Sequence, residues 1–91
     1  MNNHFYKDTS AVLDYQFDWS SWLDTEEIII SSDVTVDEGL TLSDKVDGDT
    51  TVIVWLSGGT DAHTYFVNCK ITTSDSRIDE KFMIISCVDY L

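Results

Sequence analysis

The hydrophobic residues of this chain alternate with polar residues over short stretches, a period of two that is typical of β-strands. The first such stretch spans residues 11–17, where Leu13, Tyr15 and Phe17 alternate with polar positions. The comparable β-branched or apolar runs cover residues 27–36, 40–46, 50–57, 64–73 and 77–88. Only residues 20–27 could form a helical turn, with Asp24 and Glu27 as a capping-box pair.

Turn-forming residues separate the strand-like runs at regular, short intervals, as in a sandwich or a barrel. Tyr65 opens the penultimate run directly after a glycine-containing turn, which is the place of a tyrosine corner whose hydroxyl bonds to backbone upstream. This position favours a sandwich. We therefore predict an all-β fold, a single immunoglobulin-like antiparallel β-sandwich of about seven short strands. It would cover residues 11–91, after an N-terminal arm at residues 1–10.

The composition narrows the possible partners. The 91 residues suffice for one small domain, and 17 acidic against five basic residues give a net charge of −12. A field of this sign repels phosphates and anionic lipid, so we expect no nucleic acid and no membrane as partners. Residues 1–50 carry nine Asp and three Glu against two Lys, a net −10. This local excess would suit a basic protein partner, or it would serve solubility.

Cysteine usage and the N-terminal sequence indicate synthesis in a reducing cytoplasm. No segment resembles a signal peptide or approaches membrane-spanning length. If residues 74–76 form a hairpin turn, Cys69 lies opposite a residue near position 81, which leaves Cys87 about 20 Å further along its strand. That separation exceeds the reach of a disulfide. We therefore expect two buried free thiols.

Catalytic and metal-binding patterns are weak. His63 is six residues from Cys69 on one strand, again about 20 Å, and no CxxC or HxxxH spacing occurs. Asp44, Asp47 and Asp49 form the most calcium-like cluster, but the bidentate glutamate of such loops is missing and an ordinary solvated turn is favoured. We predict no enzyme activity, no catalytic residue, no cofactor and no metal.

The aromatic residues give the first indication of an interaction surface. Of the three tryptophans, we expect two in the core, where each large ring covers about 150–250 Å². Trp22, next to Asp24 in an acidic segment, is the one that we expect to be exposed. These two residues are therefore candidate contact residues.

The last predicted strand gives the second indication. Both of its alternating sets are apolar, Phe82 and Ile84 on one side and Met83, Ile85 and Cys87 on the other. One set faces the core, so the other must be covered by something else or remain as an exposed apolar patch.

The order of several short motifs resembles a family of small bacteriophage proteins, often labelled fiber-tail adaptor or minor virion proteins. The motifs are KD-x-x-A-x-LDY-x-FDW-x-x-WL at residues 7–23, EGLTL at 38–42, VWLSGGT at 54–60 and ITTSDSRIDEK at 71–81. Two turn positions depart from the family pattern. Thr9 stands where the family usually has proline, and Ser76 where it usually has glycine.

The resemblance implies a non-enzymatic structural component of a tailed-phage virion, made in the cytoplasm of the bacterial host. It implies an immunoglobulin-like adaptor module at the tail or neck that contacts other virion proteins, including copies of itself in a symmetric assembly. In the family, Met83, Ile85 and Cys87 would point inward, which makes Phe82 and Ile84 the candidate contact pair. A capsid decoration protein, or a carbohydrate- or surface-binding module with an exposed Trp22 or Trp55 beside carboxylates, remains the alternative.

Overall fold

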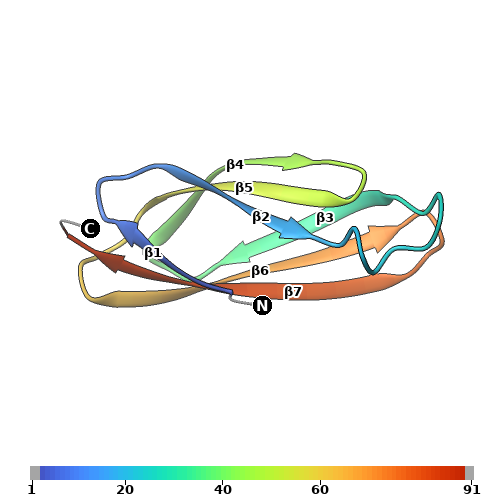
Figure 1. Cartoon of the computed structure of the whole chain (residues 1–91). Helices are drawn as coiled ribbons and strands as arrows, with labels where there is room; N and C mark the ends of the chain where they lie inside the picture. Colours follow the sequence, from blue (N-terminus) through green and yellow to red (C-terminus); the bar gives the residue numbers. More distant parts are fainter. Residues whose placement is uncertain (1–2, 90–91) are drawn as a thin grey trace.

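The computed structural model describes residues 3–89, which form seven strands in two facing sheets (Figure 1). The strands are β1 (His4–Asp8), β2 (Leu13–Asp18), β3 (Ile29–Val36), β4 (Leu40–Asp47), β5 (Thr51–Gly58), β6 (His63–Thr73) and β7 (Ile78–Val88). All six runs of the hydrophobic pattern become strands. The described residues include no helix that could cross a membrane. The expected all-β sandwich is confirmed.

The strand order is that of an immunoglobulin-like sandwich with one strand moved. One sheet has the order β1-β7-β6-β3 and the other β2-β5-β4. Strands β2, β5 and β4 correspond to strands B, E and D of an immunoglobulin constant domain. In the other sheet, β3, β6 and β7 correspond to strands C, F and G. The first strand lies beside the last instead of beside the second, and these two strands run parallel. All other pairs are antiparallel.

Strand β1 lies within the segment expected to be an N-terminal arm. It pairs with residues 84–88 of β7. Its Lys7 is fully buried, and the ammonium donates hydrogen bonds to the backbone carbonyl oxygens of Asp8 at 2.9 Å and Gly58 at 2.7 Å. Because Gly58 belongs to β5, the Lys7 side chain connects the two sheets. These bonds offset part of the cost of burying a charge.

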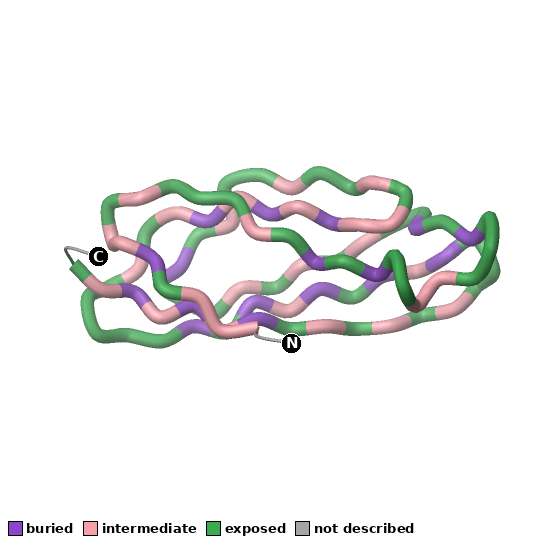
Figure 2. The backbone as a smooth tube through the Cα atoms, viewed as in Figure 1, coloured by how far each residue is buried: buried purple, intermediate pink, exposed green. Residues whose placement is uncertain are grey.

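The core lies between the sheets and is built from the inward-facing residue of each alternating pair. Along β5, β6 and β7, buried positions alternate with positions that are half-buried or exposed (Figure 2). The fully buried aliphatic and thiol side chains are Val52, Val54, Leu56, Val67, Cys69, Ile71, Ile85 and Cys87. Trp19, which follows β2, closes one part of this core, and its indole Nε1 donates a 2.8 Å hydrogen bond to Asp79 Oδ2.

The tyrosine corner is confirmed. The Tyr65 hydroxyl accepts a 3.0 Å hydrogen bond from the backbone N–H of Thr60, five residues upstream. The ring packs closely on Gly39, whose φ is +104°, so that a β-carbon at this position would lie only 3.0 Å from a ring carbon. A glycine is therefore required there by both backbone conformation and space.

The β6–β7 hairpin has the register expected from its turn. Cys69 pairs with Lys81, and both cysteines are free and buried. Burial raises the pKa of the Cys69 thiol to about 12. Within the turn, Ser76 has a φ of +63°, in the left-handed region that favours glycine. This is one of the two positions at which the sequence departs from the family pattern.

The segment between β2 and β3 forms turns and no helix. One half of the expected capping box forms, because Glu27 Oε1 accepts a 2.9 Å bond from the Asp24 N–H. The Glu27 N–H, however, donates to the backbone carbonyl oxygen of Asp24 at 3.0 Å and not to its side chain. Glu26 between them has a φ of +67°, which is incompatible with a continuing helical turn.

Candidate interaction surfaces

One end of the sandwich is organised around a buried ion pair. Glu27, only 3% exposed, accepts bonds from Arg77 Nη2 at 2.5 Å and Arg77 Nε at 3.0 Å, and a further bond from the Thr73 hydroxyl. The Arg77 guanidinium, with help from Thr73, lowers the pKa of Glu27 to about 2 in spite of its burial. The carboxylate therefore stays charged and holds the β2–β3 loop onto the β6–β7 hairpin.

The same arginine packs on the ring of Trp22. The Arg77 guanidinium lies 3.9 Å from the centroid of the Trp22 ring, and Arg77 Nη2 lies 3.9 Å from Asp24 Oδ2. Trp22 is consequently half-buried and packs against the core, whereas Asp24 is exposed. Trp19 is the fully buried tryptophan and Trp55 is half-buried. The expectation that Trp22 would be the exposed tryptophan is therefore wrong, because Arg77 covers one face of its ring.

Acidic side chains converge at one place in the described part of the chain, and it is not the turn around Gly48. Asp24, Glu27 and Asp75 bring carboxylate oxygens within 4.8 Å of one another. The Arg77 guanidinium already pairs with Glu27 and lies 3.9 Å from Asp24 Oδ2, so it compensates part of this negative charge. Asp44, Asp47 and Asp49 do not come together in this way. Asp24, Glu27 and Asp75 therefore form an ion-pair cluster with Arg77.

Each histidine makes a hydrogen-bond contact to an uncharged group. His4 Nε2 lies 2.6 Å from the Ser86 hydroxyl, and His63 Nδ1 lies 2.9 Å from the Asp61 carbonyl oxygen. The strand register places His63 opposite Cys87, a pairing that the sequence did not suggest. Burial raises the pKa of the Cys87 thiol, which disfavours the thiolate that a cysteine nucleophile needs.

The outer face of the sheet β1-β7-β6-β3 carries an apolar patch, which we call the aromatic face. It consists of Tyr6, Phe66, Phe82 and Ile84. Tyr6 is 57% exposed, Phe66 51% and Phe82 48%. The centroids of the two phenylalanine rings lie 6.0 Å apart, and Ile84 pairs with Phe66 in the strand register. Met83, Ile85 and Cys87 point into the core, so the predicted orientation of β7 is confirmed.

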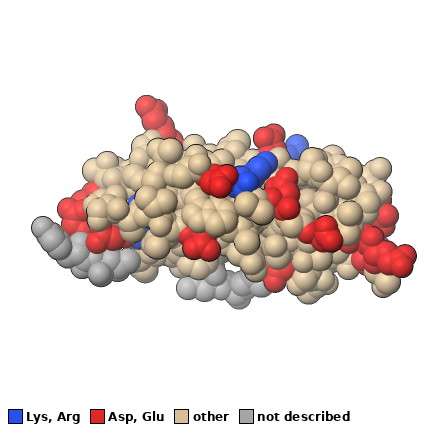
Figure 3. All heavy atoms as spheres, turned by 90° about the horizontal axis from the view of Figure 1, so that it is seen from above, with Lys and Arg blue, Asp and Glu red and all other residues tan. Residues whose placement is uncertain are grey.

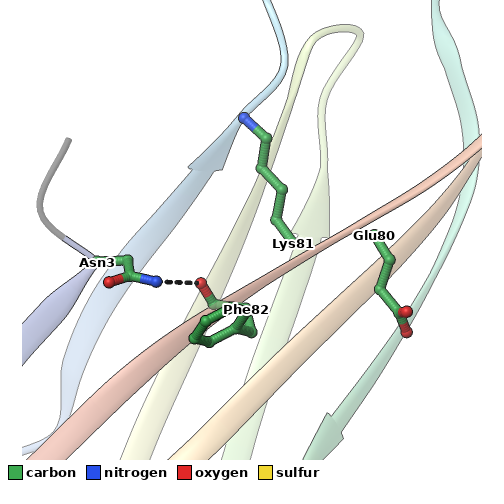
Figure 4. Close-up of a pocket in the computed structure, with 4 residues that line it drawn as sticks. All are labelled: Asn3, Glu80, Lys81 and Phe82. Carbon is green, nitrogen blue, oxygen red and sulfur yellow. Dashed lines mark hydrogen bonds between the residues drawn. The ribbon is translucent and has the colours of Figure 1, made fainter.

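A shallow hollow of about 330 Å³ borders the aromatic face where β1 begins (Figure 4). It is lined by Asn3, Glu80, Lys81 and Phe82, and Asn3 Nδ2 donates a 3.3 Å bond to the Phe82 carbonyl oxygen. Figure 4 shows Lys81 pointing towards β2, away from Glu80 and Phe82. The Lys81 ammonium donates to the Asp18 carbonyl oxygen at 2.6 Å.

Two members of the aromatic face were not expected from the sequence. Tyr6 belongs to the segment expected to be an arm, and its place beside β7 depends on a long-range parallel pairing. Phe66 could have been found, because it alternates with the inward-facing Tyr65 and Val67 and must therefore point outward. Of the residues proposed from the sequence, Phe82 and Ile84 lie on this face, whereas Trp22 and Asp24 lie in the β2–β3 loop at one end of the sandwich (Figure 1).

Fold and surfaces together define a small β-sandwich module whose most distinctive feature is an exposed apolar sheet face. The family described as podophage GP4 fiber-tail adaptor protein gp77 matches residues 7–86. The chain belongs to this family of phage structural adaptor proteins. No curated protein matches the chain. The resemblance found in the sequence motifs is thereby confirmed.

Proposed function

We propose that this protein is a non-enzymatic module at the tail or neck of the virion, where its aromatic face binds other virion proteins. The family match supports an adaptor role in the phage particle. The main support for this contact surface is that Phe66 and Phe82 are each about half exposed on the same sheet face. Contiguous exposed apolar patches mark protein interaction sites in soluble proteins.

The charge distribution around the aromatic face supports a protein partner. The register aligns Glu80, Lys70 and Asp33 in one row across three strands, so that a basic residue separates the two acidic ones. The neighbouring row contains Phe82 and the neutral Asn68. This face thus has few uncompensated charges although the chain carries a net charge of −12. An apolar centre with charges at its rim is the usual composition of a protein–protein interface.

We include copies of the same chain among the partners, in a symmetric assembly. Weak contacts suffice in such an arrangement, because symmetry presents several copies at once and raises the effective concentration of each contact. We propose that the protein is made in the host cytoplasm and binds neither nucleic acid nor membranes, since its charge repels both. Asp24 and the exposed part of the half-buried Trp22 would form a smaller second contact.

The test is incorporation into particles. Phage that lack the gene would be complemented with Phe82→Ser or Ile84→Ser, and the amount of the protein in purified particles would be measured by immunoblot. Both side chains point away from the core, so folding should persist while incorporation falls at least severalfold. Ile30→Ser removes an isoleucine that is 61% exposed on β3 and is the matched control.

Two results would contradict this assignment. Unfolding of the purified Phe82→Ser and Ile84→Ser proteins, monitored by circular dichroism, would mean that these residues support the core. Full incorporation of both folded variants would show that the face is not a contact surface. Immunogold labelling of particles would then test the location, since gold over the capsid would indicate a decoration protein instead of a tail or neck adaptor.

A further inference from the structure

The outer face of the second sheet, β2-β5-β4, presents a tryptophan between two carboxylates. Trp55 of β5 pairs with Asp14 on one side and with Asp44 on the other. Its neighbours Val54 and Leu56 point into the core, so the indole points outward. Trp55 is half-buried, and both aspartates are exposed. We call these three residues the Trp55 row.

A β-bulge in β4 creates this row. The register shifts between Leu42, which pairs with Leu56, and Asp44, which pairs with Trp55, so that Ser43 is the extra residue. Without the bulge, Asp44 would share the inward direction of Leu42. The bulge instead turns Asp44 outward, and the Ser43 hydroxyl is fixed by a 2.7 Å bond to the Ser57 hydroxyl. Bulges commonly redirect a side chain next to a functional surface.

The bulge also turns the nearest basic residue away from this face. Lys45 pairs with the inward-facing Val54, and its ammonium donates a 2.9 Å bond to the Ser32 carbonyl oxygen on the opposite sheet. A 3.9 Å contact to Asp47 further engages this ammonium. The carboxylates of Asp14 and Asp44 are thus left without a basic neighbour in their own row.

The whole face has an acidic character. Figure 3 views the molecule from above, onto the β2-β5-β4 layer, and shows more acidic than basic side chains on this surface. Asp18 follows Asp14 and Gln16 on the outward side of β2. The net charge of −12 adds a long-range field of the same sign. A cationic ligand would be attracted both by the field and by the local carboxylates.

We propose that the Trp55 row binds a basic segment of a partner protein, with an arginine or lysine side chain stacked on the indole. Neighbouring strands lie about 4.8 Å apart, so a carboxylate stands on each side of the ring within reach of a cation placed over it. Tryptophan is the best aromatic partner for such a cation. Neutral sugars also stack on tryptophan, but they gain nothing from the acidic field. The proposal goes beyond the aromatic face, because it uses the opposite sheet and a different chemistry.

The experiment uses the isolated full chain and a tetra-arginine peptide with blocked ends. Binding would be followed in ¹H–¹⁵N NMR spectra by the indole N–H signal of Trp55 and by the backbone amide signals of β2, β4 and β5, which the Trp55→Thr variant retains. A tetra-citrulline peptide would serve as the neutral control. We expect the Trp55 signal to shift with the arginine peptide and not with the citrulline peptide. The shift should weaken on raising the salt concentration from about 0.05 to 0.5 M, because the Debye length falls.

Two variants locate the site. The double variant Asp14→Asn with Asp44→Asn should weaken binding of the peptide roughly tenfold, as expected for the loss of two exposed charge contacts. Asp33→Asn with Glu38→Gln changes the net charge equally at exposed positions outside this sheet face and is the matched control. It should weaken binding less than about threefold. Trp55→Thr, which preserves a β-forming residue on an outward site, should weaken binding by a similar factor of about ten.

Each contrary result overturns the proposal. Equal losses in the two double variants would mean attraction by net charge alone. Unchanged binding by the folded Trp55→Thr protein, checked by circular dichroism, would remove the indole from the site. A Trp55 shift with maltohexaose and none with the arginine peptide would assign the row to carbohydrate. The proposed virion role is not touched by these outcomes, because it is tested on the aromatic face.

Discussion

Replacing Trp19 by phenylalanine should lower the free energy of unfolding by about 2–3 kcal/mol. The Trp19 side chain is fully buried, and its Nε1 bonds to Asp79 Oδ2 at 2.8 Å. Loss of this charge-assisted bond costs about 1–2 kcal/mol, since water can partly replace it at the half-buried Asp79. The smaller ring leaves a void of about 40 Å³, which at about 24 cal/mol per Å³ adds about 1 kcal/mol.

Urea denaturation followed by far-ultraviolet circular dichroism would measure this change. For a domain of this size, it corresponds to a fall in Tm of roughly 10–20 °C. Trp55→Phe makes the same chemical change at a half-buried outward position and should cost less than about 1 kcal/mol. In a double-mutant cycle, Trp19→Phe and Asp79→Ala should show a coupling energy of about 1 kcal/mol or more.

Either of two results would contradict the expected contribution of Trp19. A cost of Trp19→Phe below that of Trp55→Phe would mean that the burial of Trp19 does not determine its contribution. Additive effects of Trp19→Phe and Asp79→Ala would mean that the hydrogen bond between the two side chains contributes nothing to stability.

Two further predictions concern the loops. The pKa of Glu27 is lowered from 4.5 to about 2 in the folded state, so its stabilising effect is complete above pH 4.5 and is lost as the pH falls towards 2. Acid denaturation curves of Glu27→Gln should lack this part of the pH dependence; an unchanged slope would contradict the role of the Arg77 pair. Ser76→Gly should stabilise the protein by about 0.5–1 kcal/mol in thermal melts, because it relieves the φ of +63°. Ser21→Gly, in an exposed turn without positive φ, should not stabilise it, and equal effects of the two changes would exclude relief of backbone strain.

Short-range features of the fold were predictable from the sequence. The alternation of apolar residues located six strands, and the turn at residues 74–76 fixed the pairing of Cys69 with Lys81. The tyrosine corner at Tyr65 could be predicted because it depends on a hydrogen bond to Thr60, only five residues away in the sequence. Each of these predictions depends on the local period or on a nearby turn, and these are the properties that the sequence expresses directly.

Long-range features were not predictable in the same way. The parallel pairing of β1 with β7 joins residues about 80 positions apart, and nothing in residues 4–8 specifies that partner. The inward position of Lys45 and the outward position of Asp44 depend on the bulge at Ser43, which interrupts the two-residue period of the strand. Trp22 was misjudged because Arg77, from the other end of the chain, covers its ring.

The parallel arrangement of β1 and β7 has a practical consequence for tagging the protein. Because the two strands run in the same direction, the chain enters beside the middle of β7 and leaves at the end of it. Asn3 bonds to the Phe82 carbonyl oxygen, so a peptide fused ahead of it would begin next to the aromatic face. Strand β7 ends at Val88, at one end of the sandwich, whose longest dimension is 43 Å (Figure 1). Reporters and affinity handles that leave both sheet faces accessible therefore belong at the carboxyl end.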